Sequence, residues 1–157
     1  MIEDQLFCTF HLGDHLFGVE IDQVQEVLRA QEITRVPLAA PSVRGVINLR
    51  GRIIPAIDLR CCFQMEAFPP GRSPANVVVR GAGSASASFL VDDIGDVVQT
   101  PFSAYEASPS TLGAPARELV EGVYKLQGGI LLVLAVGRVL RAAFAEAPIP
   151  LGRSGTC

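Results

Sequence analysis

Tryptophan is absent from the 157-residue sequence, and histidine, tyrosine and methionine occur only twice each. Lysine and arginine number 13 against 16 aspartates and glutamates, which gives a formal net charge of -3. Proteins that bind nucleic acid normally carry a basic surplus, and small barrels that bind oligonucleotides usually add exposed aromatic residues. The sequence therefore argues against a nucleic-acid partner, and a small-barrel oligonucleotide or sugar binder is the least favoured alternative.

Long apolar runs are also missing. The longest fully apolar stretch is Ile130 to Val136, far short of the ~20 residues that a membrane-spanning helix needs. The first residues, Met-Ile-Glu-Asp-Gln, are acidic where a signal peptide would be basic. We therefore expect a cytoplasmic protein with no direct membrane insertion. The hydrophobic fraction of 49% is too high for a disordered chain and indicates a folded core.

The sequence offers few groups for catalysis or metal binding. It contains no nucleophile-elbow motif, no phosphate-binding loop and no cluster of carboxylates beside a histidine. His11 and His15 flank a predicted turn, and Asp92-Asp93 is interpreted as a turn with a helix cap. The cysteines show no metal-ligand spacing. We expect Cys8, Cys61 and Cys62 to be small buried residues, and Cys157 to be an exposed thiol at the C-terminus. We therefore expect no enzyme activity, no metal and no cofactor.

Apolar spacing predicts mainly short strands. The expected strands cover Leu6–Leu12, Leu16–Ile21, Asn76–Arg80, Ala87–Val91, Leu119–Leu126 and Ile130–Val136, with two more flanking a tight turn at Arg50-Gly51-Arg52. The expected helices cover Asp22–Ala30, Asp92–Val98 and Gly137–Glu146. In the last of these, Val139, Leu140, Ala143 and Phe144 are expected to face inward. A further short helix is expected to be capped by Asp58 and to end at Phe63. The weakly patterned segment Thr100–Glu118 is predicted to be a connector.

The sequence repeats itself after 77 residues. Without a gap, Val43, Gly45, Val46, Leu49, Gly51, Ile53, Ile54 and Ile57 align with Val120, Gly122, Val123, Leu126, Gly128, Ile130, Leu131 and Leu134. A weaker echo aligns Val24 and Val27 with Ile94 and Val97. Each copy alone has too few residues to bury the apolar face of its strands fully. The repeat therefore predicts two small β units that close into barrels and pack together.

Four arginines lie in the stretch from Arg44 to Arg60, and the second copy of the repeat lacks them. The planar guanidinium of arginine suits both protein interfaces and ion pairs. One interpretation is that Arg50 or Arg60 satisfies Asp58 within the fold; for Arg44 and Arg52, solvation and an interface role are equally open. Arg50 lies beside Asn48 in a tight hairpin, so we expect it to help order a binding surface.

The segment Val43–Arg60 resembles the CheW-like domain of bacterial chemotaxis coupling proteins. The likeness lies in Gly45-Val46-Ile47-Asn48-Leu49-Arg50-Gly51, then Ile54-Pro55 and Ile57-Asp58-Leu59-Arg60. It extends to Phe10-x-Leu12-Gly13, Phe17-Gly18-Val19, Val24-Gln25-Glu26-Val27, Val36-Pro37, Val91-Asp92-Asp93-Ile94 and Gly122-Val123. One departure is Ala135, which stands where the family usually has an aspartate before the last helix. A helix cap worth about 1 kcal/mol is therefore missing there.

The resemblance implies an all-β fold with short helices: two five-stranded SH3-like barrels, related by a pseudo-twofold repeat, that share a hydrophobic core. Residues 1–157 would form a single CheW-like domain of two intertwined barrel subdomains. The implied function is a non-enzymatic adaptor that couples the cytoplasmic tips of methyl-accepting chemoreceptors to the regulatory domain of the histidine kinase CheA. Other CheW-like domains would be its neighbours in array rings, and the protein would be cytoplasmic and recruited to chemoreceptor arrays.

In that family the first barrel docks the kinase, and a groove between the barrels takes the helical hairpin of the receptor. By position, the resemblance assigns receptor binding to Val24, Glu26, Gly45, Arg50 and Ile53. Further candidates for a partner interface are Arg44, Asn48, Arg52 and Asp58. For Val24 and Ile53, ordinary core packing is an equal alternative. The alternative function is a CheW-like paralogue that binds receptor or array partners but has lost kinase docking.

Overall fold

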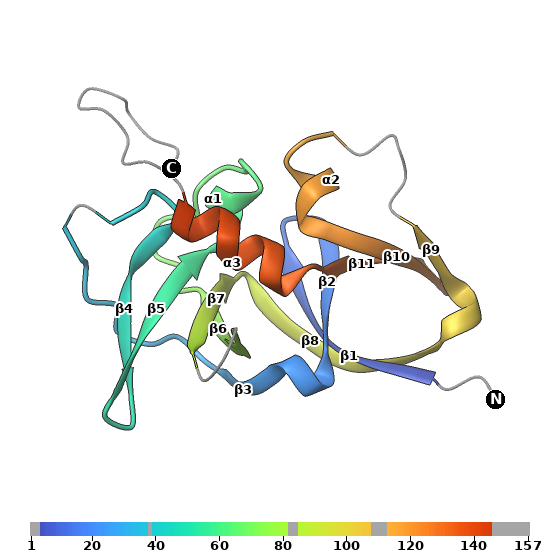
Figure 1. Ribbon diagram of the computed structural model, residues 1–157, viewed down its shortest axis with the longest axis horizontal. Coiled ribbons are helices and arrows are strands. Elements are labelled where there is room, and N and C mark those ends of the chain that lie inside the picture. The colour runs from blue at the N-terminus through green and yellow to red at the C-terminus, as the bar shows by residue number, and fades with distance from the viewer. Residues whose placement is uncertain (1–3, 38, 82–84, 108–112, 146–157) are drawn as a thin grey trace.

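The computed structural model describes residues 4–37, 39–81, 85–107 and 113–145, which form many short strands and a few short helices (Figure 1). The strands are β1 (Asp4–Leu12), β2 (His15–Glu20), β3 (Val24–Leu28), β4 (Val43–Leu49), β5 (Arg52–Asp58), β6 (Ala75–Arg80), β7 (Ser86–Val91), β8 (Asp93–Pro101), β9 (Tyr105–Ala107), β10 (Val120–Leu126) and β11 (Gly129–Leu134). The α-helices are α1 (Leu59–Cys62), α2 (Ala116–Leu119) and α3 (Val136–Ala145), and the 3-10 helices are η1 (Ile21–Gln23) and η2 (Phe102–Ala104). Within the described ranges, no helix is both long and apolar enough to cross a membrane.

The strands form two curled sheets that lie side by side, with α3 crossing the front of the molecule (Figure 1). One sheet, here called the first barrel, has the order β3-β6-β7-β5-β4, and the other, the second barrel, has the order β8-β1-β2-β11-β10-β9. The expected all-β class with two SH3-like barrels is confirmed. The expectation of five strands holds for the first barrel, whereas the second has six because β9 pairs with the outer side of β10.

The two barrels exchange strands. Strand β3 follows β2 along the chain but pairs with β6 of the first barrel, and β8 follows β7 but pairs with β1 of the second barrel. The 77-residue repeat is visible in the pairing, since the β4–β5 and β10–β11 hairpins have the same register irregularity, at Val43/Gly45 and at Val120/Gly122. The duplicated sequence therefore produces duplicated hairpins, one in each barrel.

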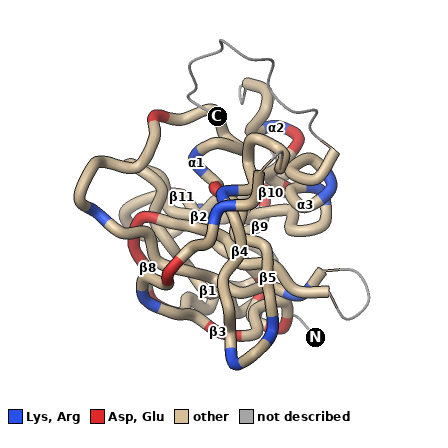
Figure 2. Tube along the Cα trace, turned by 90° about the vertical axis from the view of Figure 1, so that its left-hand side faces the viewer, with Lys and Arg blue, Asp and Glu red and all other residues tan. Residues whose placement is uncertain are grey.

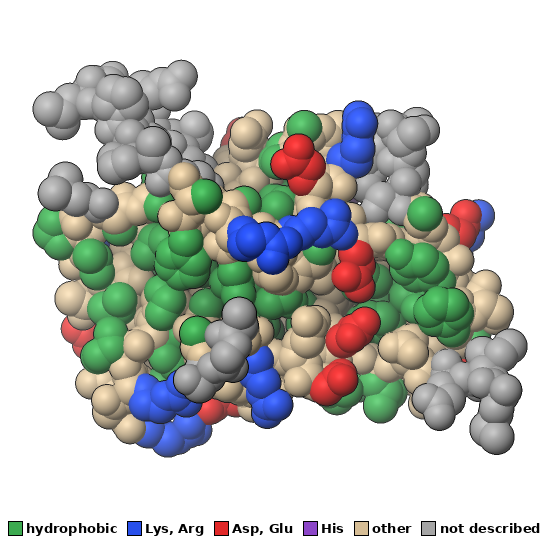
Figure 3. Space-filling view, viewed as in Figure 1, with side chains coloured by type: hydrophobic (Ala, Val, Ile, Leu, Met, Phe, Trp, Pro, Cys, Tyr) green, Lys and Arg blue, Asp and Glu red, His purple; other side chains and the backbone are tan. Residues whose placement is uncertain are grey.

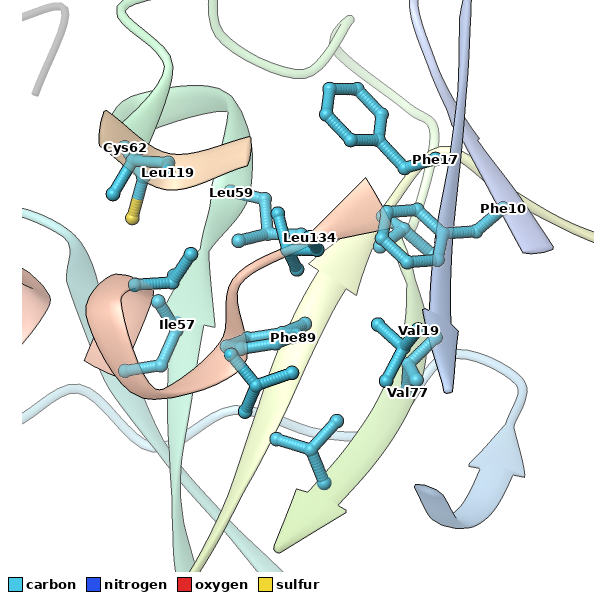
Figure 4. Packing of buried hydrophobic residues seen from close by; sticks show 14 of the residues in the cluster. Phe10, Phe17, Val19, Ile57, Leu59, Cys62, Val77, Phe89, Leu119 and Leu134 are labelled. Carbon is cyan, nitrogen blue, oxygen red and sulfur yellow. The ribbon is translucent and has the colours of Figure 1, made fainter. Parts of the chain in front are cut away.

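A shared core joins the barrels, as the repeat predicts. Phe10, Phe17 and Val19 of the second barrel pack in one cluster with Ile57 and Phe89 of the first (Figure 4). Each barrel also has a smaller interior of its own, made of Ile47, Leu49, Ile54, Ala56, Val78 and Leu90 in the first and Phe7, Tyr124, Leu131 and Val133 in the second. Burial of this shared surface holds the two barrels together, because burying apolar area is the dominant favourable contribution to folding.

Two predicted helices are wrong, and β-bulges explain both errors. The segment Asp22–Ala30 contains the last two residues of η1 and strand β3, and Asp92–Val98 contains most of β8. In β3 the pairing with β6 shifts between Val24 and Glu26, and the β1–β8 pairing shifts between Cys8 and Phe10. A bulge inserts one extra residue into a strand. With the extra residue, apolar side chains on one face of the strand are three positions apart instead of two. A spacing of three is also the spacing of apolar residues on one face of a helix.

Smaller corrections concern individual positions. Phe144 on α3 is predicted to face inward but is 53% exposed. Cys61 and Cys62 are buried as predicted, whereas Cys8 is only half-buried. The predicted connector Thr100–Glu118 holds η2, β9 and α2 in its described parts. The expected thiol of Cys157 lies outside the described residues. His11 and His15 are exposed on either side of the β1–β2 turn, as predicted.

Candidate protein-interaction site

The tight turn between β4 and β5 is built by Asn48. Its side-chain oxygen accepts a hydrogen bond of 2.9 Å from the backbone N–H of Gly51. The two residues at the turn, Arg50 and Gly51, both have positive φ angles of 52° and 85°, which glycine adopts readily and arginine adopts rarely. Figure 2 shows the basic positions at this hairpin tip at the bottom of the view. Asn48 therefore orders the turn that carries Arg50, and its role in a partner interface stays a prediction.

Arg50 reaches from the hairpin tip to Glu26 on β3. Its two terminal nitrogens donate hydrogen bonds of 2.6 and 2.7 Å to the two carboxylate oxygens. The hydrogen bonds from Arg50 lower the pKa of Glu26 below its ordinary value. The side chain of Arg50 is 71% exposed and that of Glu26 is 25% exposed. The structure thus brings two of the predicted receptor-facing residues together in one exposed ion pair.

Arg44 and Asp58 form a second pair at the other end of the same hairpin. Arg44 donates to the Asp58 carboxylate, and the other carboxylate oxygen accepts a hydrogen bond of 3.1 Å from the N–H of Cys61. Asp58 is therefore the helix cap that the sequence predicts for α1. The interpretation that Arg50 or Arg60 satisfies Asp58 is wrong, because Arg44 does so and the other two bind different acids.

Arg60 binds Asp92, and this pair joins the two barrels. The guanidinium donates hydrogen bonds of 2.8 and 2.6 Å to the Asp92 carboxylate, which also accepts one of 2.7 Å from the N–H of Gly13 in the β1–β2 turn. Burial raises the pKa of Asp92, but the hydrogen bonds from Arg60 and Gly13 and the nearby positive charges outweigh it and lower the pKa below its ordinary value. Sequence reasoning placed Asp92 in a helix cap and missed this contact, since the partners are 32 residues apart.

Gly45 is buried, and it is constrained by packing. A Cβ atom at this position would overlap the backbone carbonyl of Thr34, which forms an isolated bridge with Val46. A side chain that approaches backbone so closely cannot be accommodated without movement of the sheet. Gly45 therefore allows the segment before β4 to lie against the barrel.

Ile53 lies in an apolar groove between β5, the described residues at the facing ends of β6 and β7, and α3. This groove, here called the hairpin–α3 groove, has a volume of about 560 Å³ and is lined by Arg52, Ile53, Ile54, Pro55, Gly81, Ala85, Ser86, Ala87, Leu140, Arg141 and Phe144. Ile53 is 63% exposed, so the alternative of ordinary core packing is excluded for this residue. Figure 3 shows hydrophobic side chains gathered on the left of the molecule, beside basic side chains along α3.

A second exposed apolar surface lies where the edge strands of the two barrels meet. We call it the β3–β8 surface and define it by the exposed apolar residues of the two strands, Val27 on β3 and Ile94 and Val97 on β8, each between 38% and 56% exposed. Val27 and Ile94 also line a shallow pocket of about 490 Å³ between the barrels. Val24 is different, because it is partly buried and packs against the shared core. The sequence signal for this surface is the weak internal similarity that aligns Val24 and Val27 with Ile94 and Val97. The prediction that both segments are helices hides it.

The described residues form a two-barrel module with exposed apolar surfaces. A family model described as the CheW-like domain matches residues 6–144. The chain therefore belongs to the CheW-like family.

Known proteins resemble the chain over most of its length. The chemotaxis protein CheW of Klebsiella aerogenes is 29% identical over 136 residues, which covers 87% of this chain and 81% of that protein. Protein PilI of Pseudomonas aeruginosa is 29% identical over 115 residues, which covers 73% of this chain and 64% of PilI. The crystal structure of the scaffolding protein TtCheW from Thermoanaerobacter tengcongensis superposes with a TM-score of 0.78 at 26% identity and covers 86% of this chain and 91% of that one.

Proposed function

We propose that this protein is a non-enzymatic chemosensory adaptor that couples chemoreceptors to the regulatory domain of the histidine kinase CheA. The observation that carries the proposal is the match of the CheW-like domain over residues 6–144, which spans both barrels. The relatives named as chemotaxis or scaffolding proteins support a coupling role. Two separate exposed apolar surfaces on one rigid scaffold suit a protein that holds two partners at once.

The β3–β8 surface is the proposed site for the helical tip of the receptor. A helix can lay its apolar stripe against Val27, Ile94 and Val97, which lie exposed at the junction of the barrels. Glu26 lies on the same strand as Val27 and pairs with Arg50, so acid and base groups lie next to this surface. Such charges fix the orientation of a docked helix more than they add to its affinity. Gly45 supports this proposed site only indirectly, through the packing of the first barrel.

The hairpin–α3 groove of the first barrel is the proposed docking site for the kinase. Ile53 and Phe144 are large apolar side chains that stand exposed on opposite sides of it. Exposed apolar residues of this size gathered around a groove are typical of interaction sites. In this proposal Ile53 contacts the kinase rather than the receptor. Binding to both partners would recruit the protein to chemoreceptor arrays, where other CheW-like domains are proposed neighbours.

Calorimetry with each isolated partner tests the proposed function. The chain is titrated separately with the CheA regulatory domain and with a receptor tip fragment from the same organism. We expect direct binding to both, with dissociation constants of about 1 µM, typical of a weak but specific interface. Binding to the receptor fragment with no detectable binding to the kinase domain would indicate the paralogue that has lost kinase docking. Binding to neither partner would contradict the adaptor role.

Arg50→Ala tests whether the exposed ion pair acts in binding. Because both groups of the pair reach solvent, we expect the variant to unfold cooperatively at nearly the wild-type urea midpoint. Its affinity for the receptor fragment should fall roughly tenfold, as for an arginine at the centre of an interface. The change Lys125→Ala, at an exposed ion pair with Glu106 away from the β3–β8 surface, is the matched control and should leave receptor affinity unchanged. Loss of the cooperative unfolding transition in Arg50→Ala would show that the arginine is structural.

A further inference from the structure

The hairpin–α3 groove differs from neighbouring pockets in the charges around it. Arg52 lines it from β5 and Arg141 lines it from α3, and none of the described residues around it is acidic. Three other pockets on the described surface are each lined by both arginine and aspartate. In a chain with a net charge of -3, an apolar groove with basic residues and no acid of its own has an unsatisfied electrostatic preference for negative charge.

The two arginines have no carboxylate partner within the described ranges. Arg52 donates one hydrogen bond of 3.2 Å to the hydroxyl of Ser86, and Arg141 forms no ion pair with any described residue. Arg50 and Arg60, by contrast, each bind a carboxylate through two hydrogen bonds. A guanidinium whose donors are not used within the fold retains the bidentate geometry that recognises a carboxylate of a partner.

The positions of Arg52 and Arg141 suit a partner in which acidic side chains flank an apolar one. The floor and rim of the groove supply apolar contacts through Ile53, Pro55 and Phe144, and the arginines come from elements on opposite sides of it. Because α3 and β5 belong to the packed scaffold, the spacing between the two guanidinium attachment points is fixed by the fold. A matching surface would therefore carry an apolar side chain between carboxylates.

We infer that Arg52 and Arg141 are specificity-determining residues that make the hairpin–α3 groove select a protein segment with apolar side chains flanked by carboxylates. This inference rests on the proposed kinase docking at the same groove. The apolar floor supplies contact area that many surfaces could use, whereas the arginines reject a partner that brings lysine or no charge to the rim. Their role is greatest at low ionic strength, where exposed charges are least screened.

Charge reversal tests the inference with the CheA regulatory domain as the probe. The double variant with Arg52→Glu and Arg141→Glu should bind this domain roughly 100-fold more weakly than wild type, because attraction becomes repulsion at two positions. The deficit should shrink at high ionic strength. Arg138→Glu is the control, since Arg138 lies one turn earlier on α3 and does not line the groove. If wild type binds and the double variant binds equally well, the inference is wrong while the proposed function stands.

A peptide pair tests the same groove without the kinase. One synthetic helical peptide carries leucines flanked by glutamates, and its twin carries glutamines in place of the glutamates. The expected result is that the glutamate peptide shifts the NMR signals of the Arg52 and Arg141 side-chain N–H groups and the glutamine peptide does not. Equal shifts with both peptides, or shifts with neither, would overturn the inference. This readout stays decisive even if wild type fails to bind the kinase domain, which would contradict only the proposed function.

Discussion

Replacing Gly45 by alanine is expected to lower the free energy of unfolding by about 3 kcal/mol, the upper part of the range for overpacked sites. The added Cβ would overlap the carbonyl of Thr34, and backbone cannot move aside as the end of a flexible side chain can. Either the segment around Thr34 detaches from β4 or the β4–β5 hairpin shifts. Urea unfolding followed by circular dichroism measures the loss as a lower midpoint with a similar slope.

The β10–β11 hairpin, which corresponds to β4–β5 in the repeat, provides the control for this prediction. Gly129 begins β11, and a Cβ atom there would meet no neighbour within 4 Å. Gly129→Ala should therefore leave the midpoint almost unchanged. If Gly45→Ala is as stable as Gly129→Ala yet loses receptor binding, Gly45 contacts the receptor directly and its structural role is wrong. If stability and binding fall together, the loss of binding follows from the damaged barrel.

Removing Arg60 is expected to destabilise the protein by about 2 kcal/mol, because a largely buried carboxylate would lose its charged partner. The side chains of Arg60 and Asp92 are only 12% and 13% exposed. In Arg60→Ala, Asp92 keeps the hydrogen bond from Gly13 but loses both bonds from the guanidinium. The connection between α1 of the first barrel and the β1–β2 turn of the second would be weakened. Lys125→Ala, at a solvent-exposed pair of 3.3 Å with Glu106, should have little effect on the urea midpoint.

The pH dependence of this pair has a definite sign. The pKa of Asp92 is lowered in the folded protein, so the unfolded state binds the proton more readily than the folded state does. The stabilisation is therefore fully present above the unfolded aspartate pKa of about 3.9 and is lost as the pH falls below that value. We expect the stability difference between wild type and Arg60→Ala to shrink when unfolding is measured below pH 4 instead of at neutral pH. A difference that stays constant would mean that the ion pair is not its source.

The limits of sequence reasoning follow from the bulges and from long-range contacts. The hairpins of the repeat were predictable because alternation and a turn glycine are local signals, and both copies agree. Strands β3 and β8 were mistaken for helices because each contains an irregularity in pairing, which depends on a partner strand that the local sequence does not reveal. The cap at Asp58 was predictable because its acceptor contact lies three residues away.

The arginines show why the site was only partly predictable. Composition and spacing identified Arg50 as a surface residue, but its partner Glu26 is 24 residues away on a strand predicted to be a helix. The same reasoning assigned Asp58 to Arg50 or Arg60, whereas topology brings Arg44 to it. Phe144 was predicted to be buried because helical spacing does not reveal where α3 leaves the core. Its exposure is what completes the hairpin–α3 groove.

The central claim is that one chain holds a receptor tip and a kinase regulatory domain at different surfaces. Sedimentation velocity on a mixture of the three proteins tests it most directly. The predicted result is a single faster-moving species that contains all three components in equal numbers, which forms because the β3–β8 surface and the hairpin–α3 groove are separate. Mutual displacement of the two partners, or the failure of either to join the complex, would contradict the account.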